Sequence, residues 1–186
     1  MSCFNNSRRL LTLIEDIIRL SRLDEGVRGE VTPVDLTALI QHCVQKLTPA
    51  AQNAQVSISA SGNDPVLISG DHALLEEMLT NLLENGIKYN HAGGYVRARA
   101  EMADGRAVVT VADNGVGIAP EDQQRVFERF YRVDKSRSKQ TGGTGLGLSI
   151  VKHGAQVHHA QIAMQSALGE GTTITLTFPA QSSGKK

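Results

Sequence analysis

A leucine-rich stretch between residues 71 and 88 constrains the fold more than any other part of this 186-residue sequence. Apolar side chains recur there at intervals of three and four, which predicts an amphipathic helix with a wide apolar face. They are Leu74, Leu75, Met78, Leu79, Leu82 and Leu83. Asp71 is placed to cap the first turn. Such a helix must bury its apolar face against a second layer of structure.

The segments around this helix alternate between helical and strand-like patterns. Asp35 can cap another helix, which we expect to end near Pro49, and residues 145–157 predict a third. Period-two patterns predict strands, and the simplest pairing joins neighbours along the chain. These strands are residues 56–60 with 66–68, 95–101 with 107–112, and 161–166 with 172–178. The order predicts an α+β fold, a two-layer α/β sandwich with helices on one face of a mixed, mostly antiparallel sheet.

The N-terminal region carries a separate helical pattern. Leu10, Leu13, Ile17 and Leu20 are spaced 3, 4 and 3, which predicts one long helix before the sandwich. This helix could dock on the following domain, pair with a second chain, or cap the core, and periodicity does not choose among these. We divide the chain into a helical unit over residues 1–28, a main domain over residues 31–180 and a disordered tail over residues 181–186.

Composition excludes several classes of function. Lysine plus arginine equals aspartate plus glutamate at 19 each, so no positive field is available for nucleic acid. The sequence holds no apolar run of about 18 residues, so we do not expect this chain to span a membrane. Cys3 and Cys43 are the only cysteines, which favours reduced thiols in a cytoplasmic location.

Three polar side chains share one face of the leucine-rich helix. Asn81, Asn85 and Lys88 are spaced 4 and 3. Asparagine is a poor residue inside a helix because its side chain competes for backbone hydrogen bonds. An amide oxygen suits Mg²⁺, which also binds substrate phosphates, and a lysine can meet those phosphates. The alternative is an ordinary solvated helix face.

A carboxylate and two glycines follow the strand predicted over residues 107–112. Asp113 can accept a hydrogen bond from an exocyclic amine, while Gly115 and Gly117 would let a flat base approach the backbone. The alternative is a common turn. The sequence therefore predicts a candidate base pocket here.

A glycine-rich segment opens the helix predicted over residues 145–157. Backbone amides at a helix N-terminus form an anion site, so triphosphate binding is its natural use, against the alternative of a flexible linker. Its residues are Gly142, Gly143, Thr144, Gly145, Leu146 and Gly147. The connection from residue 116 to residue 144 has little apolar periodicity, which is typical of a lid or a disordered segment.

Four motifs in order resemble the N, G1, F and G2 boxes of sensor histidine kinases. They read NLLENGIKYN, DNGVGI, FERFYRVDKSRS and GGTGLGLSIVKH. With the closing GEGTTITLTFP, the resemblance covers roughly residues 31–180 and implies the Bergerat-type ATP-binding fold. It also implies ATP and Mg²⁺ as ligands.

The resemblance assigns roles by position. Asn85 would coordinate Mg²⁺, Asn81 and Lys88 would lie near the phosphates, and Arg132 would reach the γ-phosphate. Phe127 and Phe130 would anchor the lid by packing. The nucleotide would be held by Tyr89, Asp113, Gly115, Gly117, Gly143, Thr144, Gly145, Leu146 and Gly147.

The same resemblance bears on the N-terminal helix and on partners. LLTLIEDIIRLSRLDEG looks like the second helix of a dimerisation and phosphoacceptor hairpin. None of the six histidines has the surroundings of the family's acceptor, so we expect surface or packing roles for them. The resemblance implies part of a longer, homodimeric and membrane-anchored kinase. Its partners would be an acceptor helix on the same or a partner protomer and a response regulator receiver domain.

Related hydrolases of the gyrase, Hsp90 and MutL type carry a glutamate one turn before the magnesium asparagine, as general base. Asn81 stands there, and an amide cannot accept a proton from water, which favours phosphoryl donation. A regulatory nucleotide-binding module or a slow ATPase remains the alternative.

The sequence departs from the family's pattern at two places. Alanine is frequent in the family at the position of Gly86, and glycine inside a helix costs about 0.5–1 kcal/mol relative to alanine, so we expect a looser helix end here. The segment VHHAQ, residues 157–161, lacks a glycine turn that the family often has at this place.

Overall fold

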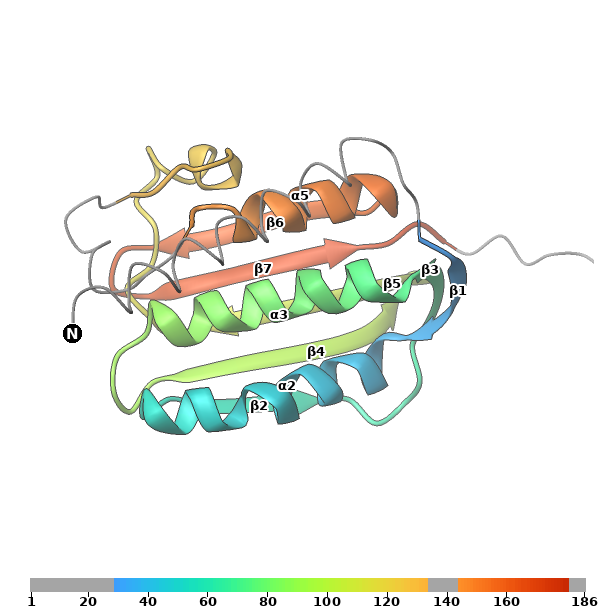
Figure 1. Cartoon of the computed structure of the whole chain (residues 1–186), viewed down its shortest axis with the longest axis horizontal. Coiled ribbons are helices and arrows are strands. Elements are labelled where there is room, and N and C mark those ends of the chain that lie inside the picture. The colour runs from blue at the N-terminus through green and yellow to red at the C-terminus, as the bar shows by residue number, and fades with distance from the viewer. Residues whose placement is uncertain (1–28, 134–143, 181–186) are drawn as a thin grey trace, which may run out of the picture.

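The computed structural model describes residues 29–133 and 144–180, which form two layers (Figure 1). One layer contains helices α2 (Leu36–Asn53), α3 (His72–Lys88) and α5 (Gly147–Val157), and the other is a five-stranded sheet. The predicted α+β sandwich with helices on one face is confirmed. The long N-terminal helix and the disordered tail were predicted for residues 1–28 and 181–186, which lie outside the described residues.

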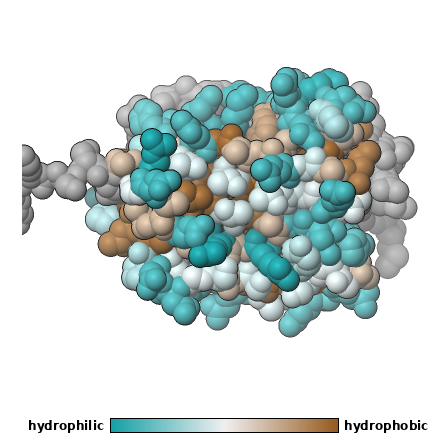
Figure 2. Space-filling model, turned by 180° about the vertical axis from the view of Figure 1, so that it is seen from behind, coloured by the Kyte–Doolittle hydropathy of each residue, from teal (hydrophilic) through white to brown (hydrophobic). Residues whose placement is uncertain are grey.

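The sheet is mixed and mostly antiparallel, as predicted. Its strand order is β2-β4-β5-β7-β6, and β2 pairs in parallel with β4 while the other neighbours are antiparallel. The strands are β2 (Ser57–Ser61), β4 (Tyr95–Ala103), β5 (Arg106–Asp113), β6 (Gln161–Ala167) and β7 (Gly171–Thr177). Figure 2 shows the molecule from behind, on the side away from the helices, where hydrophilic residues alternate with smaller apolar areas.

The predicted pairing of residues 56–60 with residues 66–68 is wrong. Strand β2 pairs with β4, and β3 (Leu67–Asp71) pairs antiparallel with β1 (Val31–Asp35), which the sequence pattern did not reveal. Proline inside β1 had hidden it, since proline cannot donate to a strand ladder and is tolerated mainly at edges. The two strands form a separate small sheet at one end of the molecule.

Helix α2 is longer than predicted. Asp35 caps it as expected, because its carboxylate accepts hydrogen bonds from Thr37 N at 2.9 Å and Ala38 N at 3.4 Å. The helix passes through Pro49 and ends at Asn53. Leu47 and Ala51 on either side of the proline are buried in the core. Their burial offsets the backbone hydrogen bond that proline removes.

Two glycines bring α3 close to its neighbours. A Cβ atom added to Gly86 would lie 3.0 Å from both methyl groups of Val96, so this glycine lets α3 approach β4. Helix α3 continues past Gly86 to Lys88. On the other side, a Cβ on Gly154 would collide with the Met78 side chain, so α3 and α5 also pack closely. Within the described residues, no helix is both long and apolar enough to cross a membrane.

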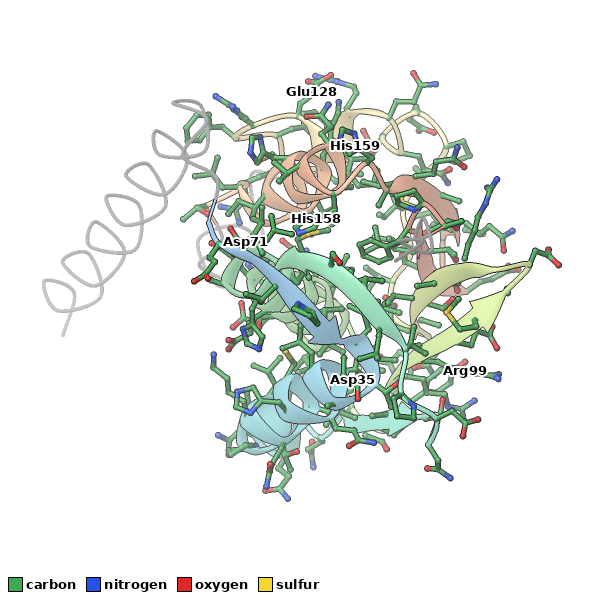
Figure 3. All side chains as sticks on the ribbon, turned by 90° about the vertical axis from the view of Figure 1, so that its right-hand side faces the viewer. Asp35, Asp71, Arg99, Glu128, His158 and His159 are labelled. Carbon is green, nitrogen blue, oxygen red and sulfur yellow. The ribbon has the colours of Figure 1, made fainter. Side chains whose placement is uncertain are left out.

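His158 joins the end of α5 to the start of α3 (Figure 3). Its Nε2 accepts a hydrogen bond from Asp71 N at 3.0 Å, and its Nδ1 lies 2.7 Å from the carbonyl oxygen of Gly154. Because one partner only donates and the other only accepts, the ring is neutral with its proton on Nδ1. His158 is thus a buried packing residue. His159, next to it, has φ 53° and supplies the left-handed turn expected from a glycine.

Candidate nucleotide site

Helices α3 and α5 meet at Asn81. The side-chain amide of Asn81 donates to the carbonyl oxygen of Glu77 at 2.9 Å. A Cβ atom on Gly147 would lie only 2.8 Å from Asn81 Oδ1, so this glycine brings the first turn of α5 against α3. Two motifs that are far apart in the sequence therefore share one surface, as the prediction for a common site requires.

Asn85 lies one turn further along α3 and is partly buried. Within residues 29–133 and 144–180, its side chain forms no hydrogen bond. An asparagine inside a helix without such a bond leaves its amide oxygen available to a ligand. This donor fits Mg²⁺, which keeps most of its waters and takes few protein oxygens.

Lys88 and Arg132 bring positive charge to the same end of α3. Burial lowers the pKa of the Lys88 ammonium, and the charge of Arg132 lowers it further, while Glu84 acts in the opposite direction. Two neighbouring cations in a partly buried place repel each other, and an anion between them would relieve that repulsion. Lys88 and Arg132, both expected near the phosphates, thus lie close enough to interact, which is consistent with a phosphate site at this end of α3.

Asp113 ends β5 beneath the last turns of α3. Burial raises the pKa of its carboxyl group, against the lowering effect of backbone N–H groups at Gly115 and Thr172. Gly115 N donates to Asp113 Oδ1 at 2.8 Å. A Cβ on Gly86 would lie 3.5 Å from the Asp113 Cβ, which places this carboxylate next to the Asn85 turn. Each carboxylate oxygen has two lone pairs, so the group can accept a further hydrogen bond from an amine.

Two positions in the turn after Asp113 accept only glycine. Gly117 has φ 68°, and a Cβ there would collide with the carbonyl oxygen of Ala167. At Gly115 a Cβ would collide with the carbonyl oxygen of Tyr89. Val116 N donates to that same Tyr89 oxygen at 3.0 Å, so the turn is attached to the end of α3. Tyr89 itself is 44% exposed, and the Lys88 ammonium lies 5.2 Å from the centre of its ring.

The start of α5 is held by its own backbone and by the lid. Gly145 has φ 78°, its carbonyl oxygen accepts a hydrogen bond from Phe130 N at 2.9 Å, and Leu146 is fully buried. Thr144 lies just before this turn and is partly exposed. Gly143 falls outside the described residues. The first turn of α5 thus presents backbone N–H groups on the side of Asn81.

The lid departs from the prediction at Phe130. Its backbone is in the left-handed region with φ 63°. Phe130 is 55% exposed, so its side chain does not anchor the lid in the described part of the chain. The backbone bond to Gly145 does so instead. Phe127 is partly buried in the short 3₁₀ turn Arg125–Phe127, which is compatible with the packing role predicted for it.

Sequence reasoning missed the polar contacts that hold the first part of the lid. Ser166 on β6 accepts a hydrogen bond from Ile118 N at 2.8 Å. Gln123 Nε2 donates to the carbonyl oxygens of Ile118 at 3.1 Å and Ser166 at 2.8 Å. Ser166 is more than 40 positions from both Ile118 and Gln123, so no local pattern could have paired it with them.

Comparisons with known proteins identify the family to which this chain belongs. Residues 70–182 match the family model described as histidine kinase-, DNA gyrase B-, and HSP90-like ATPase. The sensor-like histidine kinase SenX3 of Mycolicibacterium smegmatis is 42% identical over 174 residues, which are 93% of this chain and 45% of that protein. The phosphate regulon sensor protein PhoR of Pseudomonas aeruginosa is 38% identical over 178 residues, which cover 93% of this chain and 40% of PhoR.

Solved structures share the fold. Full-length ShkA in complex with AMPPNP matches with a TM-score of 0.80 at 29% identity, over 91% of this chain and 35% of that one. The mycobacterial sensor histidine kinase MprB matches with a TM-score of 0.67 at 29% identity, over 80% of this chain and 97% of that one. The chain spans less than half the length of the curated relatives it matches.

Proposed function

Because the chain belongs to the family of histidine kinase-, DNA gyrase B- and HSP90-like ATPases, we propose that it donates the γ-phosphoryl group of ATP to a histidine. The sensor histidine kinases among its relatives support the role of an ATP-binding kinase domain of a sensor histidine kinase. The acceptor would be a phosphoacceptor helix of the same or a partner protomer. From there the phosphoryl group would pass to an aspartate of a response regulator receiver domain.

The observation that carries the proposal is the polar face at the end of α3. Within the described residues the amide oxygen of Asn85 accepts no hydrogen bond there, and the partly buried Lys88 lies within range of the charge of Arg132. Asp113 lies beside the same turn of the helix. A ligand that can bind all of these groups has a nucleobase at one end, several negative charges at the other, and a bound metal ion.

The residues divide the nucleotide between them. We assign the adenine amine to Asp113, with Gly115, Gly117 and Tyr89 shaping that pocket, and the triphosphate to Lys88 and Arg132. The N–H groups of Gly143, Thr144, Gly145, Leu146 and Gly147 would face the phosphates. Asn85 would hold Mg²⁺, which neutralises phosphate charge when bound.

Asn81 decides between transfer and hydrolysis. Its amide cannot accept a proton from water, and its nitrogen is already donating to Glu77. The site therefore positions the γ-phosphoryl group without activating water, and an imidazole nitrogen arriving in line forms the new P–N bond as the bond to ADP breaks. A nucleotide-binding regulatory module or slow ATPase is the second candidate, since the binding groups alone would serve it equally.

Transfer of labelled phosphate tests the proposal. The chain is mixed with Mg²⁺, γ-labelled ATP and a separately made protein containing the phosphoacceptor hairpin of the 42%-identical relative. We expect acid-labile label on a histidine of the hairpin and none on the chain itself. Binding of ATP without any transfer would favour the regulatory module. Robust acid-labile self-labelling would show that the acceptor has been misplaced.

We further propose that the parent protein is a membrane-anchored homodimer with this domain in the cytoplasm. The support is the kinship with sensor proteins and the helix pattern in residues 1–28. Nucleic acid is not proposed as a partner of this chain, because its positive and negative charges are equal in number.

A further inference from the structure

Tyr131 occupies a defined position beside the residue proposed to meet the γ-phosphate. Its hydroxyl donates to Asp122 Oδ1 at 2.5 Å. The guanidinium carbon of Arg125 lies 4.2 Å from the centre of the Tyr131 ring. The hydrogen bond to Asp122 raises the pKa of the Tyr131 phenol, so the hydroxyl keeps its proton across the physiological range. One contact fixes the tip of the side chain and the other fixes its face.

Asp122 belongs to the part of the lid that is attached to the sheet. Its neighbour Gln123 bonds the carbonyl oxygens of Ile118 and Ser166. Asp122 N donates to the carbonyl oxygen of Ala119 at 3.0 Å. Because Ser166 lies on β6, the carboxylate that holds Tyr131 is fixed relative to the core.

Arg132 follows Tyr131 directly in the chain. On the other side of Tyr131, Phe130 is bonded through its backbone to Gly145. Arg132 is close enough to Lys88 for its charge to lower the pKa of that lysine. The backbone before Arg132 is therefore held at two residues. The side chain of Tyr131 is bonded to Asp122, and the backbone of Phe130 is bonded to Gly145 at the start of α5.

We propose that Tyr131 is a positioning residue, which sets the reach of Arg132 toward the γ-phosphate through its hydrogen bond to Asp122. This inference rests on the proposed function of Arg132. The hydrogen bond between Tyr131 and Asp122 would affect contacts with the γ-phosphate alone, since Asp113 and the glycine turn that follows it take no part in it. Loss of the Tyr131 hydroxyl should weaken binding of ATP and leave binding of ADP unchanged.

The test compares ATP and ADP affinities of the full chain with Mg²⁺ by titration calorimetry. For Tyr131→Phe, which keeps the ring and removes the donor, we expect ATP to bind about three- to tenfold more weakly and ADP to change less than about twofold. Asp122→Asn keeps an acceptor oxygen and should remain near wild type, whereas Asp122→Ala should reproduce Tyr131→Phe. Tyr95→Phe is the matched control, because its ring stacks with Arg97 and its hydroxyl forms no hydrogen bond within the described residues.

The outcomes separate this inference from the proposed function. Arg132→Ala should abolish the preference for ATP over ADP, and if it does not, the proposed role of Arg132 fails. If Arg132→Ala removes the preference but Tyr131→Phe retains it, only the positioning role is overturned. Equal weakening of ATP and ADP by Tyr131→Phe would also overturn it, since a general structural role would act on both nucleotides.

Discussion

Helices α3 and α5 run side by side, and their two ends are built differently (Figure 1). Near the small sheet β1–β3, Asp71 caps α3 through Leu74 N at 3.1 Å, accepts Gly29 N at 3.1 Å, and donates its own N–H to His158. At the opposite end, Asn85 has no side-chain hydrogen bond within the described residues, and Lys88 lies beside another cation. We call these the closed end and the open end.

The difference teaches where the molecule gains stability and where it binds. Within the described residues, no buried side-chain nitrogen or oxygen lacks a hydrogen-bond partner. The closed end satisfies its polar groups internally, so changes there should reduce stability. The open end leaves polar groups exposed to a ligand, at a cost in helix propensity and charge repulsion, so changes there should reduce binding and leave stability unchanged or higher.

The largest effect on stability is expected from His158→Ala. The substitution leaves Asp71 N without its acceptor and opens a cavity beside Phe178, whose ring centre lies 6.3 Å from that of His158. We expect the free energy of unfolding to fall by about 3 kcal/mol, with ATP affinity of the folded protein unchanged. Urea unfolding and calorimetric titration measure the two quantities.

His159→Gly is the matched control for that substitution. His159 is exposed and has φ 53°, a conformation that glycine adopts without strain. Its stability should equal or slightly exceed that of the wild type. A loss in His159→Gly as large as that in His158→Ala would show that the buried hydrogen bond is not what holds the closed end.

A smaller effect is expected at the open end when pH rises. Burial and Arg132 place the pKa of Lys88 below its usual value of 10.5. The folded state therefore releases this proton at lower pH than the unfolded state. As pH rises through the lowered folded value toward 10.5, the contribution of Lys88 to stability becomes more favourable. Over the same window the lysine loses its charge, so affinity for the fully ionised triphosphate should fall.

Lys88→Arg sharpens this prediction. Arginine keeps its charge throughout the alkaline range, so its ATP affinity should change less with pH than that of the wild type. Titration at several alkaline pH values, below the onset of alkaline unfolding, measures the difference between the two proteins. Parallel pH profiles for the wild type and Lys88→Arg would refute a role for the Lys88 charge in binding.

The sequence predicted the features that local chemistry determines. Asp35 and Asp71 cap their helices as expected, because a carboxylate before an apolar periodic segment bonds free N–H groups nearby. The hairpin of β4 and β5 and that of β6 and β7 also formed as predicted. Short turns fix these pairings within a few residues.

Features set by long-range contacts could not be predicted. Strands β2 and β3 alternate as expected but take partners outside their own hairpin, since alternation identifies a strand and not its neighbour. Gly86 suggested a weak helix, yet its role depends on Val96 in the sheet. At the site, Asn85 and Asp113 were predicted from motifs. The hydrogen bond between Tyr131 and Asp122 lies in a segment without apolar periodicity, and no sequence motif predicted it.

The most direct test of the account is Asn85→Ala, titrated with ATP in the presence and absence of Mg²⁺. Asn53→Ala, an exposed asparagine at the end of α2, serves as the control. We predict that Asn85→Ala abolishes magnesium-dependent ATP binding while the free energy of unfolding stays equal or rises by up to about 0.5 kcal/mol, because alanine is the better helix former. Unchanged magnesium-dependent affinity in Asn85→Ala would contradict the assignment of the open end as the nucleotide site.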